Sequence, residues 1–172
     1  MKDLASAAPT LLNDLYERAT DPTGWPVFLE KVAALLRSDT GSLRLTGLCD
    51  PVVYHSHTIG FHHRINEHYE AEAVELDPFR EALAAAPLGK VLDSTSVISD
   101  QAFSRSEHYR TVFRPNGNFY ACGAQFEREN GRGMHIGIHR PNHRGPFSRD
   151  ECKALETFSP HLRRVIQLSG LL

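Results

Sequence analysis

The segment from about residue 118 to residue 140 constrains the fold more than any other part of the sequence. Two stretches rich in β-formers, 118–127 and 133–140, flank Glu129-Asn130-Gly131-Arg132. Asn-Gly pairs favour the type I′ turn, whose twist matches that of two antiparallel strands. In the second stretch the side chains alternate in character: Met134, Ile136 and Ile138 share one face, and His135, Gly137 and His139 share the other. This segment therefore predicts a β-hairpin in an antiparallel sheet that has one apolar face.

An earlier segment predicts a second hairpin. Leu43 and Leu45 alternate with polar residues, and the stretch 52–59 is again rich in β-formers. The turn residues Cys49-Asp50-Pro51 lie between the two stretches. The spacing of apolar residues elsewhere predicts helices over 8–20, 25–36, 62–74 and 100–113, a short helix beginning at Pro78, and a short strand at Val91-Leu92.

The final helix has the clearest start signal. Ser148 and Glu151 have the spacing of a capping box, with Ser148 as N-cap and Glu151 three residues later. An apolar stripe then continues to Val165 or Ile166, and we expect Pro160 to kink the helix. This stripe can pack on the sheet, on a second copy of the chain, or on both. Since two-fold dimers are the commonest oligomers, we expect a homodimer.

The order of these elements predicts the fold class. Hairpins pair their strands in antiparallel fashion, and the helices are long enough to cover a sheet. We therefore expect an α+β fold with a central antiparallel sheet flanked by helices, in an order consistent with GAF and PAS sensor domains. A chain of 172 residues fits a single domain, 1–172, with a substantial core.

Charge and composition exclude several classes of function. The net charge of -2 gives no general attraction to a phosphate backbone, so we do not expect this chain to bind DNA by itself. No apolar run approaches the roughly 18 residues that span a bilayer, and the first residues lack a signal-peptide core, which favours a cytoplasmic protein. The three cysteines have no metal-like spacing, and no Gly-x-Ser-x-Gly motif is present. We therefore expect neither an enzyme nor a cofactor.

Several segments, in order along nearly the whole chain, resemble the N-terminal sensor domain of LuxR-type transcription regulators. They are Leu15-Tyr16 with Asp21-Pro22 and Trp25-Pro26; His68-Tyr69 with Asp77-Pro78-Phe79; Ser106-Glu107-His108-Tyr109 with Phe113-Arg114-Pro115-Asn116-Gly117; and Arg144-Gly145-Pro146-Phe147-Ser148 with Pro160-His161-Leu162-Arg163-Arg164. The resemblance implies an autoinducer-binding-like fold, a pocket for a small-molecule effector on one face of the sheet, and dimerisation. It also implies contact with DNA only through a helix-turn-helix domain, which the 172 residues do not contain.

Within that family, the acyl-homoserine-lactone receptors place a Tyr and a Trp before an Asp-Pro pair. Tyr69 and Asp77-Pro78 lie at comparable places in this sequence. The Trp expected a few residues before the Tyr is absent, since that stretch reads His63-Arg64-Ile65, and so is the Trp expected after Asp-Pro. These departures argue against lactone recognition, and nothing in the sequence names another effector.

Aromatic and polar residues on the predicted elements form the candidate ligand site. Apolar walls with a few polar groups are typical of small-molecule pockets, and tyrosine hydroxyls can orient a ligand. The candidates are Tyr54, Tyr69, Asp77, Phe79, Tyr109, Phe113, Tyr120, Phe126 and His135. Core packing is the alternative role for each aromatic residue, and capping the helix that begins at Pro78 is the alternative for Asp77. His135 and His139 can line the pocket or face solvent.

Four further histidines suggest a second interpretation. His55 and His57 share one strand face, and His62 and His63 follow within a turn. Clustered imidazoles can bind a divalent metal or a haem iron. No carboxylate or cysteine stands at supportive spacing, so we expect no metal here and keep a metal- or haem-binding sensor as an alternative. A pure dimerisation module, whose pocket its own side chains fill, is the other alternative.

Overall fold

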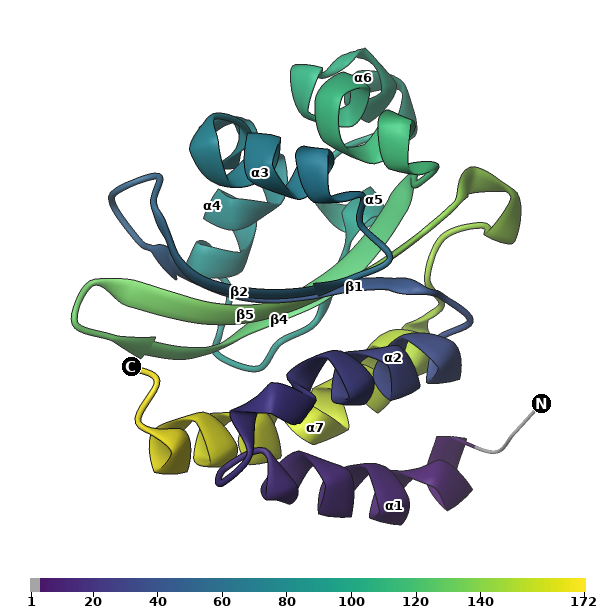
Figure 1. Cartoon of the computed structure of the whole chain (residues 1–172). Helices are drawn as coiled ribbons and strands as arrows, with labels where there is room; N and C mark the ends of the chain where they lie inside the picture. Colours follow the sequence, from purple (N-terminus) through teal and green to yellow (C-terminus); the bar gives the residue numbers. More distant parts are fainter. Residues whose placement is uncertain (1–3) are drawn as a thin grey trace.

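A computed structural model describes residues 4–172 of the chain. Its centre is a five-stranded antiparallel sheet in the order β2-β1-β5-β4-β3 (Figure 1). The strands are β1 (Thr40–Gly47), β2 (Val53–Ile59), β3 (Leu92–Asp93), β4 (Tyr120–Glu129) and β5 (Arg132–Arg140). The predicted α+β class with a central antiparallel sheet is therefore confirmed.

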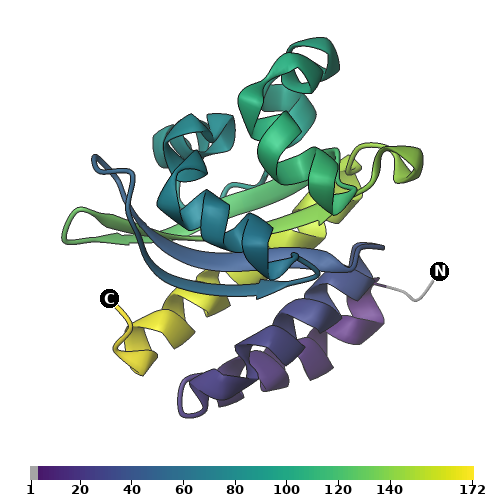
Figure 2. The ribbon, with the colours of Figure 1, turned by 45° about the horizontal axis from the view of Figure 1, so that its top comes forward.

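Helices cover both faces of this sheet, as Figures 1 and 2 show. One face carries α1 (Leu4–Glu17), α2 (Trp25–Leu35) and α7 (Arg149–Ser169). The opposite face carries the shorter helices α3 (His63–Ala71), α4 (Pro78–Ala85), α5 (Ser94–Val97) and α6 (Asp100–Arg105). Short 3-10 segments lie at Pro22–Gly24, Ala73–Leu76, Arg114–Asn116 and Asn142–Arg144, and a π-helical turn at Tyr109–Phe113.

Both predicted hairpins are present. Asn130 and Gly131 have φ angles of 52° and 75°, so both central residues of the turn are left-handed, as a type I′ turn requires. β1 pairs with β2 on one side and with β5 on the other, which places the first hairpin beside the second. The hairpin of β4 and β5, which the Asn-Gly pair predicted, therefore lies in the sheet between β1 and β3.

The main apolar core lies between the sheet and α1, α2 and α7. Met134, Ile136 and Ile138 of β5 are fully buried, and so are Leu155 and Leu162 of α7. The alternation along β5 therefore gives the sheet an apolar face, as predicted. Burying a large aliphatic side chain contributes about 1.5–3 kcal/mol, so this layer contributes strongly to stability.

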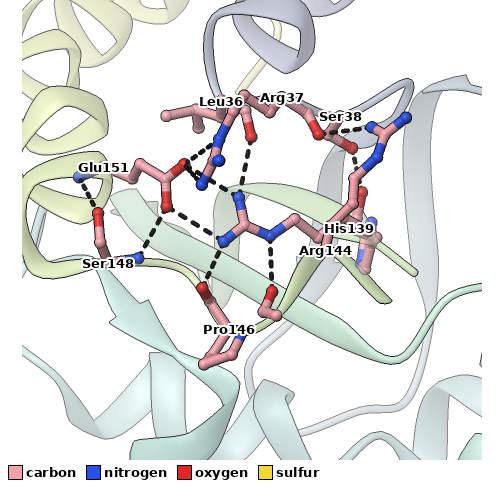
Figure 3. A network of polar contacts seen from close by, with 10 residues as sticks. Leu36, Arg37, Ser38, His139, Arg144, Pro146, Ser148 and Glu151 are labelled. Atoms are coloured by element: carbon pink, nitrogen blue, oxygen red, sulfur yellow. Dashed lines mark hydrogen bonds and ion pairs between the residues drawn. The ribbon is translucent and has the colours of Figure 1, made fainter. Parts of the chain in front are cut away.

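A buried ion pair fixes the start of α7 against the sheet (Figure 3). Arg140, at the end of β5, donates to both carboxylate oxygens of Glu151 at 3.0 and 3.1 Å. Glu151 also accepts from the backbone N–H of Ser148 at 2.8 Å, and the Ser148 hydroxyl accepts from the Glu151 N–H at 3.2 Å. The predicted capping box is therefore confirmed, and its glutamate has a second role, since Arg37 after α2 donates to the same carboxylate.

The helix predicted over 100–113 is interrupted. α6 ends at Arg105 because the Ser106 hydroxyl bonds the carbonyl of Phe103 at 2.7 Å and accepts from the N–H of Tyr109 at 3.1 Å. A serine that satisfies these backbone groups competes with the helical hydrogen bonds. The helix predicted over 62–74 likewise ends at Ala71, and the first helix begins at residue 4 rather than 8.

Within residues 4–172, no helix has both the length and the apolar character needed to span a bilayer.

Candidate ligand site

A cavity of about 60 Å³ lies on the face of the sheet that carries the short helices. Its floor comes from β1, β4 and β5, and its walls from α3, α4, α5 and the π-helical turn at Tyr109–Phe113. A water needs a cavity of roughly 10–15 Å³, so this one holds several waters or a small organic group. Apolar walls are provided by Phe61, Phe79, Leu83, Val112 and Phe113.

The pleat of the two central strands aims polar side chains into the floor. Ser42 of β1 pairs with Gly137 of β5, and Arg44 pairs with His135. Successive side chains on a strand point to opposite faces, so these residues face the cavity while their neighbours enter the apolar core. A Cβ atom on Gly137 would lie 3.3 Å from the His139 ring and 3.4 Å from the Ser42 hydroxyl. Glycine here therefore keeps the floor open.

Tyr69, Asp77 and His108 form one wall of the cavity, in which Tyr69 and Asp77 are hydrogen-bonded. The Tyr69 hydroxyl donates to Oδ2 of Asp77 at 2.8 Å, and the N–H of Phe79 donates to Oδ1 at 2.8 Å. Nε2 of His108 lies 3.8 Å from Oδ1 of Asp77. Asp77 therefore caps α4 and also faces the cavity, so both roles considered for it from the sequence are compatible.

The protonation states of Asp77 and Tyr69 follow from the groups around them. Burial opposes ionisation of Asp77, but the neighbouring His108 and the hydrogen bonds from Tyr69 and Phe79 together hold its pKa below the usual value. Burial and the Asp77 carboxylate raise the pKa of Tyr69 well above its ordinary value. The Tyr69 hydroxyl consequently stays protonated and acts as a donor to an ionised carboxylate.

The histidines around the cavity are neutral at pH 7. Burial lowers the pKa of His135 to about 4 and that of His139 to about 3. Burial also lowers the pKa of His108, although Asp77 opposes this shift. A neutral imidazole presents one N–H donor and one acceptor nitrogen, so these rings can serve either kind of ligand group.

Two arginines reach the same cavity. Arg44 is 5% exposed and stacks over the ring of Tyr69, with 4.2 Å between its guanidinium carbon and the ring centroid. Arg80 donates through Nη2 to the carbonyls of Gly47 and Asp50, each at 3.0 Å, which ties α4 to the turn after β1. Both arginines are among the residues that line the cavity.

Three buried polar atoms at this cavity have no hydrogen-bond partner within the described part of the chain. They are Nε of Arg80, Nδ1 of His108 and Nδ1 of His139. Most buried polar atoms in folded proteins are paired, because an unsatisfied one costs about 1–3 kcal/mol. Three such atoms belong to residues that line this one cavity.

The structure brings together five of the nine candidate residues. Tyr69, Asp77, Phe79, Phe113 and His135 all line the cavity. These five residues therefore surround one cavity on the sheet face, as expected. Their contact with a ligand stays a prediction. Of the two uncertain strand histidines, His139 lines the cavity as well as His135.

The other four candidates are not among the residues that line this cavity. Tyr54 is 44% exposed on the edge strand β2 and stacks with Arg132. Tyr109 packs on Phe103 and Phe119. The Tyr120 hydroxyl donates to Asp100 at 2.9 Å. Phe126 lies at the register shift of β4 and is buried on the other side of the sheet, close to α7.

Sequence reasoning missed Arg44, Arg80 and His108. Arg44 stands between Leu43 and Leu45, so the alternation that predicted this strand also places Arg44 on the opposite face from the core. That signal was present and unused. Arg80 and His108 had no comparable signal, since their positions depend on how α4 and the turn before Tyr109 pack over the sheet.

The histidine cluster does not assemble. His55 and His57 contact each other, with 2.8 Å between their Nε2 atoms, while His62 and His63 stack at the start of α3. Nδ1 of His62 accepts from the N–H of Arg64 at 3.3 Å and so caps α3. Within residues 4–172, no group of three or more His, Cys, Asp or Glu side chains could hold a metal ion. The structure therefore does not favour the metal- or haem-binding alternative.

The arrangement of an antiparallel sheet with short helices on one face and long helices on the other is similar to that of two solved structures. The ligand-binding domain of VqsR from Pseudomonas aeruginosa superposes with a TM-score of 0.72 at 14% identity, covering 96% of this chain and 97% of that one. The N-acylhomoserine lactone dependent LuxR-family factor CepR2 from Burkholderia cenocepacia superposes with a TM-score of 0.62 at 15% identity, covering 94% and 95%.

These superpositions show that the chain has the fold of LuxR-type ligand-binding domains, as its sequence motifs led us to expect. No protein-family model matches the sequence, and no curated protein matches it.

Proposed function

We propose that this chain is the sensory domain of a LuxR-type transcription regulator and binds a small-molecule effector in the sheet-face cavity. The observation that carries the proposal is the set of unpartnered buried atoms of Arg80, His108 and His139 around one cavity. The shared fold supports the regulatory context.

The proposed mechanism is a shift between two arrangements of a homodimer in the cytoplasm. A ligand that contacts both the strand floor and the helical wall binds one arrangement better, and it shifts the equilibrium by that difference in affinity. A helix-turn-helix domain connected to this one would carry the response to DNA. In this proposal the chain itself performs no catalysis.

The proposal does not extend to acyl-homoserine lactones. The chain contains one tryptophan, Trp25, and this residue is fully buried in α2, on the face of the sheet that lies opposite the cavity. The cavity therefore lacks both tryptophans of the lactone-receptor pattern. Its volume of about 60 Å³ also favours a compact ligand over one with a long acyl chain.

A thermal-shift screen against a library of bacterial metabolites tests the proposal. A ligand at about 100 times its Kd stabilises the folded state by about 2.7 kcal/mol, which raises the Tm of a chain this size by about 5–10 °C. Leu83→Trp fills the cavity wall and should abolish the shift. Val27→Trp, at an exposed position on α2, is the matched control and should leave it unchanged.

The screen also separates the proposal from a pure dimerisation module. In that case native mass spectrometry would find a dimer, but no compound would raise the Tm of the wild-type protein. A shift that survives Leu83→Trp would place the ligand elsewhere and would contradict the proposed site.

A further inference from the structure

Arg44 is a buried cation whose hydrogen bonds go to neutral groups. Its Nε donates to the Ser56 hydroxyl at 3.2 Å, and its Nη2 donates to Oδ1 of Asn66 at 2.7 Å. Across the described residues, no carboxylate lies within ion-pair distance of this guanidinium. Buried charges in proteins are normally paired, because their removal from water is costly.

The acidic groups nearest to Arg44 are committed elsewhere. Both oxygens of Asp77 accept hydrogen bonds, from the Tyr69 hydroxyl and from the N–H of Phe79. Glu70 accepts a hydrogen bond of 2.9 Å from the amide nitrogen of Asn66 and forms no ion pair with Arg44. Burial lowers the pKa of Arg44, and the charges of Asp77 and Glu70 oppose this shift only in part.

The cavity lining contains two arginines, Arg44 and Arg80, and two aspartates, Asp77 and Asp93. Oδ1 of Asp93 accepts the N–H groups of Thr95 and Ser96 at 3.0 and 3.2 Å. Neither aspartate forms an ion pair with Arg44. The Arg44 guanidinium therefore lacks a carboxylate partner of its own.

The guanidinium of Arg44 is held in a fixed orientation. Its central carbon lies over the rings of Tyr69 and Phe61, at 4.2 and 5.6 Å from the ring centroids. Stacking and the two hydrogen bonds restrict the side chain before any ligand arrives. Such preorganisation lowers the entropy cost of binding, and a guanidinium plane matches the geometry of a carboxylate.

From these contacts we infer that the effector is a compact monocarboxylate, with its anionic group on Arg44 and its apolar or aromatic body against Phe79, Phe113 and Leu83. This inference rests on the proposed function and adds the chemical class of the ligand. The unpartnered atoms of His108, His139 and Arg80 provide further hydrogen bonds to its oxygens. A carboxylate in the cavity would give Arg44 the anionic partner that it lacks.

Matched pairs of acids and amides test the inference on the wild-type protein. Benzoate and benzamide, and propionate and propionamide, have the same shape and differ in charge. We expect calorimetric titration to find each acid at least tenfold tighter than its amide. Equal affinity within a pair, or tighter binding of the amides, would overturn the inference. This comparison needs no variant and does not depend on how a mutant folds.

Variants assign the preference to Arg44. Arg44→Gln should reduce the acid-to-amide ratio to within about twofold, and Arg44→Lys should restore it in part, because the charge returns without the planar group. Arg64→Gln, at an exposed arginine on α3, is the control and should keep the wild-type ratio. A tenfold preference that persists in Arg44→Gln would overturn the assignment.

The outcomes separate this inference from the proposed function. If the amides or other neutral metabolites bind, and Leu83→Trp abolishes that binding, the sensory site stands and the carboxylate inference fails. If neither the acids nor any library compound binds in a manner sensitive to Leu83→Trp, the proposed function itself fails.

Discussion

The Tyr69 hydroxyl donates a hydrogen bond of 2.8 Å to Oδ2 of Asp77, which joins α3 to the first turn of α4 across the wall of the cavity. The same carboxylate caps α4 through the N–H of Phe79. One side chain thus starts a helix and positions a polar group at the ligand site. The stability of α4 and the shape of the cavity are therefore coupled.

Tyr69→Phe should destabilise the protein by about 1–3 kcal/mol, because a largely buried carboxylate loses a hydrogen-bond donor. Urea denaturation monitored by circular dichroism measures the change. Tyr54→Phe removes the same hydroxyl from an exposed ring and should change stability by less than about 0.5 kcal/mol. Equal effects of the two variants would show that the hydroxyl of Tyr69 does not support Asp77.

Glu151→Gln should be among the most damaging single substitutions. It removes the charge that pairs with the fully buried Arg140 and leaves that guanidinium without its anion, at a cost of about 3–5 kcal/mol. Lys31→Gln breaks the exposed ion pair with Asp14 and should cost at most about 1 kcal/mol. Chemical denaturation of both variants against the wild type provides the comparison. A loss below 1 kcal/mol for Glu151→Gln would contradict the role given to this pair.

Acid should destabilise the fold first through buried histidines and then, at lower pH, through Glu151 as well. His135 and His139 have pKa values of about 4 and about 3 in the folded state, below the usual 6.5, so the unfolded chain binds protons first as the pH falls below 6.5. Stability is therefore lost from pH 6.5 toward pH 4, by about 2 kcal/mol per histidine at pH 5.

One substitution removes the contribution of His139. His139→Gln should weaken the dependence of the unfolding free energy on pH between 6.5 and 4, with the part from His135 remaining, while His63→Gln, at an exposed position, should leave the dependence unchanged. Identical pH profiles for wild type and His139→Gln would show that His139 is not held neutral by burial.

Glu151 adds to the loss of stability at lower pH. Burial opposes its ionisation, but hydrogen bonds from Arg140, Arg37 and the Ser148 N–H lower its pKa to about 2. A depressed carboxylate pKa contributes stability above pH 4.5 that is lost as the pH falls toward 2. Glu151→Gln should remove this part of the acid dependence and keep the part above pH 4.5. Tm measurements from pH 7 to pH 2 check both statements.

The sequence predicted the sheet well because its signals are local. The turn at Asn130-Gly131 needs two left-handed residues, and the alternation along 133–140 assigns each side chain to a face. The capping box at Ser148 and Glu151 is equally local, since both hydrogen bonds close within one turn of helix. Such features depend little on the rest of the molecule.

The site was predicted only in part because it depends on packing between distant segments. Tyr69, Asp77 and Phe113 meet although more than 40 residues separate the first from the last. Ring chemistry alone could not distinguish Phe113, in the cavity, from Phe126, buried against α7. Ser106 interrupts a helix through its own hydroxyl, and the apolar spacing around it continues unchanged. The predictive signal that was overlooked is Arg44, a charged residue on the cavity face of a central strand.

The most direct test of the central claim is a nitrogen NMR spectrum of the histidine side chains, recorded with and without the compound that gives the largest thermal shift. The account predicts that the imidazole signals of His108 and His139 move on binding while those of His62 and His63 stay in place. Signals of His108 and His139 that do not change with saturating compound would contradict a ligand site in the sheet-face cavity.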